Sequence, residues 1–173
     1  MKKNILLLLF IISTFSFADE EMENKEMFRK QAYEMIDYFK NSDYENYFKY
    51  ILPELVEANG GLEELREITE SIMEDLKNNG VTLENIIVEK PEKIVAVENG
   101  LQGKMKQIIK FKTEEGYMNI TTYLVGVKYK DKNNCYFIDM ANKSYEEISF
   151  LVEELSPELD IEVMENNVEI TKE

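Results

Sequence analysis

The sequence predicts an α+β domain in which N-terminal helices pack on a bent antiparallel sheet of about five strands, followed by a C-terminal helix. Three observations predict this fold class. Apolar residues recur at helical spacing up to Gly80 and at alternate positions after it. Only short loops separate the strand-like stretches, which implies antiparallel pairing. A capping-box pattern at Ser144 then opens a further helical segment.

Residues 1–18 have the pattern of a cleavable secretory signal. Two lysines precede an eight-residue apolar run, and Ser16 and Ala18 place small residues at the positions that a signal peptidase reads. An apolar helix of that length spans about 12 Å, far less than the roughly 30 Å of a bilayer core. We therefore expect a chain that begins at Asp19, has no membrane anchor after cleavage and is periplasmic or secreted. A permanent N-terminal anchor is the alternative.

Three helices are expected before Gly80. Asp43 can cap the second, short helix, and Pro53 ends or restarts it because proline lacks the amide hydrogen. Gly60-Gly61 forms a hinge before the third helix, which ends where Gly80 suits a left-handed cap. The first helix carries the apolar stripe Phe28, Ala32, Met35, Ile36 and Phe39, and the third carries Leu62, Leu65, Ile68, Ile72 and Leu76.

Five strand-like stretches follow the helices, each bounded by residues that favour turns. Residues 99–103 are among the expected breaks because they contain an asparagine and two glycines. The expected strands are Val81–Glu89, Lys93–Asn99, Lys104–Lys112, Tyr117–Lys130 and Cys135–Met140.

The third and fourth strands favour one register. With Lys112 opposite Tyr117, one face is largely apolar and the other collects the lysines, whereas a slip of one residue would mix the two sets. The apolar face is expected to lie under the first helix. Gln107 and Thr122 face each other on it, either as polar groups of a ligand pocket or as a satisfied pair in a filled core. The candidate pocket residues are Met105, Gln107, Ile109, Ile120, Thr122 and Leu124.

The opposite face of these strands alternates lysine stems with tyrosine rings. Such side chains cover a sheet while their polar tips stay in water, so a solvated face is one interpretation. A second is that the acidic segment after Ser144 folds back over this face. A third is an anionic external partner or self-association. The candidate interaction residues are Lys104, Lys106, Lys110, Lys112, Tyr117 and Tyr123.

The segment from Ser144 onward carries ten acidic residues and one lysine. Exposed ion pairs contribute only about 0–1 kcal/mol each, so an apolar stripe must hold this segment on the domain. We expect residues 144–155 to pack on the sheet or its edge. The stripe consists of Ile148, Leu151, Val152 and Leu155.

The end of the chain is expected to become irregular. Pro157 stops the helix, and residues 159–163 alternate like a short strand. We expect one domain over residues 19–163 and a flexible acidic tail over residues 164–173.

The composition excludes several kinds of site. Without histidine there can be no Ser-His-Asp triad, HExxH metal site or histidine base. Cys135, the single cysteine, cannot form an intrachain disulfide, and its expected state is a buried thiol. After loss of the signal, 18 basic and 35 acidic residues leave a net charge of −17, which disfavours nucleic acid as a partner. Residues 131–134 lack the spacing of a calcium loop, and no cofactor or metal is expected.

Helices followed by an antiparallel meander resemble the cystatin-like α+β fold of the nuclear transport factor two and ketosteroid isomerase-like superfamily. The likeness rests on the short helix after Asn41-Ser42-Asp43-Tyr44, the Gly-Gly break and the final hairpin Val125–Tyr129 and Cys135–Asp139. It is architectural and covers about Phe28 to Met140. The superfamily often has a tryptophan in its last strand, and this chain has none. The resemblance implies a cone-shaped pocket between helices and sheet.

Carboxylate and phenol chemistry is what remains for catalysis. Enzymes with this fold can place an aspartate base and a tyrosine donor in the cone. Asp139 is one candidate base, although Ile138 and Met140 could point inward in its place. The full candidate set is Asp37, Asp139, Tyr33, Tyr47 and Tyr50.

We expect a soluble, exported, non-catalytic binding or interaction module, with a small apolar ligand or a protein as its partner. An isomerase or dehydratase-like enzyme that uses tyrosine and aspartate is one alternative. An envelope structural or assembly protein is another.

Overall fold

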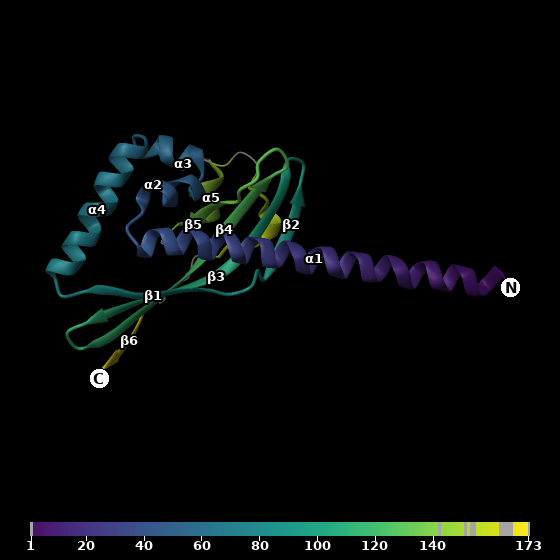
Figure 1. Ribbon diagram of the computed structural model, residues 1–173, viewed down its shortest axis with the longest axis horizontal. Coiled ribbons are helices and arrows are strands. Elements are labelled where there is room, and N and C mark those ends of the chain that lie inside the picture. Colours follow the sequence, from purple (N-terminus) through teal and green to yellow (C-terminus); the bar gives the residue numbers. More distant parts are fainter. Residues whose placement is uncertain (1, 142, 151, 153–154, 163–167, 173) are drawn as a thin grey trace.

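Helices and strands occupy separate parts of the chain, which confirms the α+β fold class (Figure 1). The computed structural model describes residues 2–141, 143–150, 152, 155–162 and 168–172. The helical part comprises α1 (Lys2–Lys40), α2 (Tyr44–Tyr47), the 3₁₀ turn η1 (Phe48–Tyr50), α3 (Pro53–Ala58) and α4 (Leu62–Asn78). The strands are β1 (Thr82–Val88), β2 (Lys93–Val97), β3 (Gly100–Thr113), β4 (Gly116–Tyr129) and β5 (Tyr136–Asp139). The chain ends with α5 (Tyr145–Ser149), η2 (Pro157–Leu159) and β6 (Val168–Lys172).

The helix boundaries follow the caps that the sequence predicted. The Asp43 carboxylate accepts a hydrogen bond from the amide of Asn46 at 3.3 Å, at the start of α2. Pro53 opens α3 at its first turn, so it restarts the helical path. Gly80 follows α4 with φ of +71°, a conformation that glycine adopts without steric cost.

The first helix is longer than the apolar stripe alone predicted. α1 runs without interruption from Lys2 to Lys40, so the expected cleavage point between Ala18 and Asp19 lies inside a helix. Its N-terminal part projects beyond the sheet in Figure 1. Within the described residues, no helix combines the length and the apolar character needed to cross a bilayer. Removal of residues 1–18 stays a prediction.

The sheet is antiparallel and is built around the long hairpin of β3 and β4. Lys112 pairs with Tyr117 and Gln107 pairs with Thr122, which confirms the predicted register. β1 and β2 both pair with β3, while β5 and β6 both pair with β4.

The expected break at residues 99–103 is wrong, because β3 already begins at Gly100. Val97 pairs with Gly100, so only two residues connect β2 to β3. Gly103 pairs with Gly126 of β4, and both lie against the ring of Phe28 on α1. The glycines that suggested a loop provide room for a close helix–sheet contact instead.

Both faces of the sheet are covered, by different parts of the chain. On one face, α1 buries Phe28, Ala32 and Met35 against the sheet, together with Met105, Leu124 and Phe137. On the other face the C-terminal segment buries Ile148, Val152, Leu155 and Leu159 against Val125, Val127 and Ile138. The prediction that residues 144–155 pack on the sheet is therefore confirmed for the residues that are described.

The C-terminal segment differs from expectation in its secondary structure. The Ser144 capping box forms, but α5 ends at Ser149, and Leu151 lies outside the described residues. In place of the short strand over 159–163, η2 precedes Asp160 in a left-handed conformation with φ of +53°, which interrupts an extended path. Val163 is outside the described residues.

A sixth strand lies within the segment expected to be a flexible tail. Residues 168–172 form β6, which pairs with Gly116–Ile120 of β4. All five of its side chains are exposed, so it lies at the edge of the sheet without entering either core. Its mobility stays a prediction, and residues 164–167 are outside the described part.

Candidate functional site

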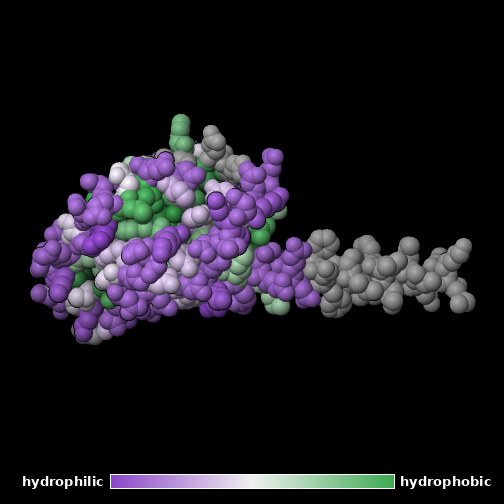
Figure 2. Space-filling model, turned by 45° about the horizontal axis from the view of Figure 1, so that its top comes forward, coloured by the Kyte–Doolittle hydropathy of each residue, from purple (hydrophilic) through white to green (hydrophobic). Residues whose placement is uncertain are grey.

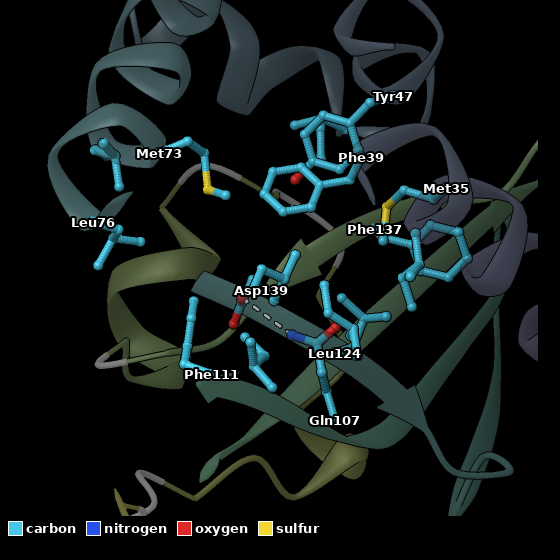
Figure 3. A pocket seen from close by; sticks show the side chains of 16 residues that line it. Met35, Phe39, Tyr47, Met73, Leu76, Gln107, Phe111, Leu124, Phe137 and Asp139 are labelled. Carbon is cyan, nitrogen blue, oxygen red and sulfur yellow. Dashed lines mark hydrogen bonds between the residues drawn. The ribbon is translucent and has the colours of Figure 1, made fainter. Parts of the chain in front are cut away.

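A cavity of about 210 Å³ lies between α1, α4 and the sheet face beneath them. Figure 3 shows Met73 and Leu76 of α4 on one side of this space and Gln107 and Leu124 of the sheet on another. Most of its lining is apolar. The lining residues are Met35, Ile36, Phe39, Tyr47, Ile51, Ile72, Met73, Leu76, Leu83, Ile86, Gln107, Ile109, Phe111, Leu124, Phe137 and Asp139.

Asp139 is the single acidic residue among the described residues of this lining, and three hydrogen bonds from described residues hold it. Thr122 Oγ1 and the amide of Ala141 donate to Oδ1 at 3.0 and 2.8 Å. Gln107 Nε2 donates to Oδ2 at 3.2 Å (Figure 3). Gln107 and Thr122 are 4% and 1% exposed, so the carboxylate is anchored by side chains that have little access to water. This arrangement fixes a negative charge at the edge of an apolar space.

The sheet register explains how these groups meet. Gln107 and Thr122 are direct partners across β3 and β4, and Leu124 of β4 pairs with Asp139 of β5. Side chains of one strand alternate between faces, so Phe137 and Asp139 share the face that α1 covers. Ile138 and Met140 belong to the core on the other face. Asp139 therefore points toward the helices, the inward of the two orientations considered.

Tyr47 brings a phenol to the same cavity from α2. Burial raises the pKa of its hydroxyl strongly, and the negative charge of Asp139 raises it further. The phenol is therefore neutral at physiological pH and can donate or accept a hydrogen bond.

α4 forms one wall of the cavity, and its own side chains stay at least partly exposed. None of its 17 residues is buried, although it carries the predicted apolar stripe. Ile68 and Ile72 are 40% and 54% exposed. An amphipathic helix normally buries its stripe against a core, so this wall has apolar area still open to contact. Figure 2 shows apolar side chains gathered at the helical end of the domain, among a largely hydrophilic surface.

The structure separates the six predicted pocket residues into two groups. Gln107, Ile109 and Leu124 line the cavity. Met105 is completely buried under α1, Thr122 lies behind Asp139 as a hydrogen-bond donor, and Ile120 is half-buried opposite Val168 of β6. Gln107 and Thr122 are thus a satisfied polar pair, and Gln107 also borders the cavity.

Part of the predicted interaction face is covered. Lys104 is 9% exposed, and its ammonium donates to the carbonyl of Asp160 at 2.8 Å and lies 3.7 Å from Glu92. It also lies 4.6 Å from the ring centroid of Tyr123, which is half-buried next to the C-terminal segment. At this end of the face, the structure agrees with the second interpretation, in which the acidic segment after Ser144 folds back over the sheet.

The remaining members of that face keep contact with water. The ammonium of Lys110 lies 3.8 Å from the ring centroid of Tyr117, a cation–π contact, and both residues are half-buried. Lys106 is half-buried and Lys112 is exposed.

The other candidates for catalysis lie away from the cavity. The Tyr33 hydroxyl donates to the carbonyl of Val88 at 3.1 Å, and the Tyr50 hydroxyl donates to Glu34 at 3.1 Å. Asp37 is exposed on α1. Cys135 is completely buried, and burial raises the pKa of its thiol to about 12, which makes it a poor nucleophile. Of the acids and phenols considered, Asp139 and Tyr47 are the two that the fold brings to one cavity.

The wall supplied by α4 was missed by sequence reasoning, whereas Tyr47 of α2 was among the candidate residues. The apolar stripe of α4 was evident from the sequence. The stripe alone does not show whether Ile72, Met73 and Leu76 face a cavity or a filled core. Among the described residues, no group of three or more cysteine, aspartate or glutamate side chains is placed to hold a metal ion. Comparisons with models of protein families, with curated proteins and with solved structures found no match to this chain.

Proposed function

We propose that this chain is an exported, non-catalytic binding module whose cavity takes a small apolar ligand. The observation that carries the proposal is the apolar space between α1, α4 and the sheet, about 210 Å³ in volume and bordered by one anchored carboxylate. An apolar cavity of about 150 Å³ is large enough to bind benzene. A helix–sheet cavity is also what the resemblance to the nuclear transport factor two-like fold implies.

The exposed stripe of α4 supports ligand binding over a purely structural role. A ligand in the cavity would cover Ile72, which is exposed, and Met73 and Leu76, which are half-buried. Each buried methylene contributes about 0.8 kcal/mol, so a seven-carbon chain supplies about 5 kcal/mol before the costs of association. Association itself costs at least about 4 kcal/mol, so a ligand of this size should bind weakly, with a dissociation constant above about 1 mM.

Methionine methyl groups offer a direct test. We would titrate the protein with 1-heptanol and record the methyl signals of Met35 and Met73, which line the cavity, and of Met140, which is buried on the other face of the sheet. The proposal expects saturable shifts for Met35 and Met73 and none for Met140. Absence of shifts up to the solubility of heptanol would contradict it, as would equal shifts at all three residues.

Export is the second part of the proposal and rests on the signal-like residues 1–18. Expressed with its full sequence in a Gram-negative host, the protein should be recovered from the periplasm or medium with Asp19 as its first residue. Recovery from the membrane fraction with Met1 retained would contradict export.

An enzyme that uses Asp139 and Tyr47 is the second candidate, because both residues border one cavity. A general base needs a lone pair directed at the substrate, and three donors leave this carboxylate one acceptor position, on Oδ2, for that purpose. The test is Asp139→Asn in a screen for isomerase and dehydratase turnover. A turnover that disappears in this variant, with the melting temperature unchanged, would favour the enzyme.

A further inference from the structure

We infer that the cavity selects an amphiphilic amine, with its ammonium group at the Asp139 carboxylate and its apolar part against α4. The inference rests on the proposed function and names the ligand class. It specifies the polar group of the ligand, which the apolar lining alone does not determine.

The first step is the acceptor capacity that Asp139 retains. An ionised carboxylate has about four acceptor positions on its two oxygens. Oδ1 accepts from Thr122 and from the amide of Ala141, while Oδ2 accepts, among the residues that the structure describes, from Gln107 alone. One position on Oδ2 is left for a donor that arrives from the cavity.

The second step is the charge around that carboxylate. None of the described residues that line the cavity is a lysine or an arginine. In the described part of the chain no cationic side chain lies within 4.0 Å of the Asp139 carboxylate oxygens. Lys143 is nearby, but its ammonium donates to the main-chain carbonyl of Asp139 at 3.0 Å. A charge in an apolar site is stabilised by an ionic partner, and a ligand cation would provide it.

The third step excludes an anionic ligand head. The same carboxylate would repel a fatty acid or a phosphate, and the Tyr47 phenol offers no positive charge. Tyr47 could accept a second hydrogen from an ammonium group, since its hydroxyl oxygen has lone pairs. An alcohol would fit the same position by donating one hydrogen bond to the carboxylate, without forming an ion pair.

The size of the cavity limits the apolar part. Scaling from benzene in about 150 Å³, a space of about 210 Å³ suits roughly eight non-hydrogen atoms. Heptylamine has this size, and 1-heptanol and heptanoate provide neutral and anionic comparisons with the same or a similar chain.

The experiment measures the affinity of the full chain for these three probes at pH 7, with the methionine methyl signals as the readout. Heptylamine adds the attraction between opposite charges to its hydrogen bond with the carboxylate, and heptanol does not, so heptylamine should bind about 10–100-fold more tightly than heptanol. Heptanoate should bind more weakly than heptanol. Equal affinity for the amine and the alcohol would overturn the inference and leave the proposed apolar site intact. Failure of all three probes to bind would overturn both.

The matched variants separate this carboxylate from the general negative charge of the protein. Asp139→Asn should weaken heptylamine about 10–100-fold and heptanol much less, because heptanol loses no ion pair. Asp37→Asn removes the same charge from an exposed position of α1 and should leave the amine preference unchanged. Equal effects of the two substitutions would contradict the inference. If Asp139→Asn does not fold, the ranking of the three probes in the unmodified protein still decides the question.

Discussion

The ring of Phe28 lies so close to Gly126 that a β-carbon on this glycine would be 2.6 Å from Cδ1 of the ring. Phe28 is completely buried, and α1 crosses the sheet at this point. Gly103, the partner of Gly126 on β3, allows slightly more room, because an added β-carbon would lie 3.2 Å from Cδ2.

Gly126→Ala should therefore destabilise the protein by about 1–3 kcal/mol, the usual cost of overpacking a core, because the Phe28 ring must shift. Gly103→Ala is the matched change and should cost less. Urea unfolding of the two variants measures the difference. If Gly103→Ala proved the more harmful, the crossing of α1 over the sheet would be placed incorrectly.

The cap residues could be predicted from sequence because each depends on a few neighbouring residues. The strand register could be predicted because it depends on the pattern of only two strands. Apolar residues alternate with other residues along β3 and β4, so a slip of one residue in their pairing would put the apolar side chains of one strand beside the polar side chains of the other. The prediction of a loop at residues 99–103 was wrong because glycine occurs both in turns and at places where another side chain approaches the backbone closely. Sequence alone does not distinguish a glycine that turns the chain from one that admits a neighbouring ring, as Gly103 does.

The direction of Asp139 could not be predicted for a different reason. Alternation assigns inward and outward positions when one face of a sheet is wet, and here both faces are covered. Phe137 and Ile138 are both buried, so the apolar residues of β5 do not identify its two faces. The cover on the second face comes from the C-terminal segment, which is distant in sequence.

That C-terminal cover leads to a second prediction. Deletion of residues 144–173 should lower the melting temperature and increase the binding of an apolar dye, because it exposes Val125, Val127 and Ile138. Deletion of residues 164–173 should change little, since the described side chains of β6 are all exposed. If the two deletions were tolerated equally, the segment would contribute nothing to the core on this face.

The buried thiol of Cys135 predicts how stability depends on alkaline pH. Burial raises its pKa in the folded protein to about 12, whereas an unfolded chain has a cysteine pKa of about 8.5. The folded state therefore retains the proton longer. The corresponding stability is complete below about pH 8.5 and is lost as pH rises toward 12, by up to about 1.4 kcal/mol per pH unit.

Cys135→Ala isolates this effect from the tyrosines. The free energy by which the natural protein exceeds Cys135→Ala should fall between pH 8 and pH 10.5 in urea unfolding experiments. A difference that stays constant over this range would mean that the folded thiol titrates like an unfolded one.

Ile72 on α4 should matter more for binding than for stability. It is 54% exposed, so Ile72→Asp should cost less than about 1 kcal/mol of unfolding free energy. It lines the cavity, so the same change should weaken 1-heptanol binding severalfold. Ile68→Asp, on the same helix but outside the cavity lining, is the control for charge and helix stability. Equal binding losses in both variants would show that α4 acts only through its own folding.

The central claim is that a ligand enters the space between α4 and the sheet. Two neighbouring residues of β3 test it most directly, because Ile109 lines the cavity and Ile108 points to the opposite face. Ile109→Trp should fill the space and abolish the shifts that 1-heptanol causes at Met35 and Met73, while Ile108→Trp should leave them unchanged. A folded Ile109→Trp protein that binds 1-heptanol as tightly as the natural chain would contradict the account.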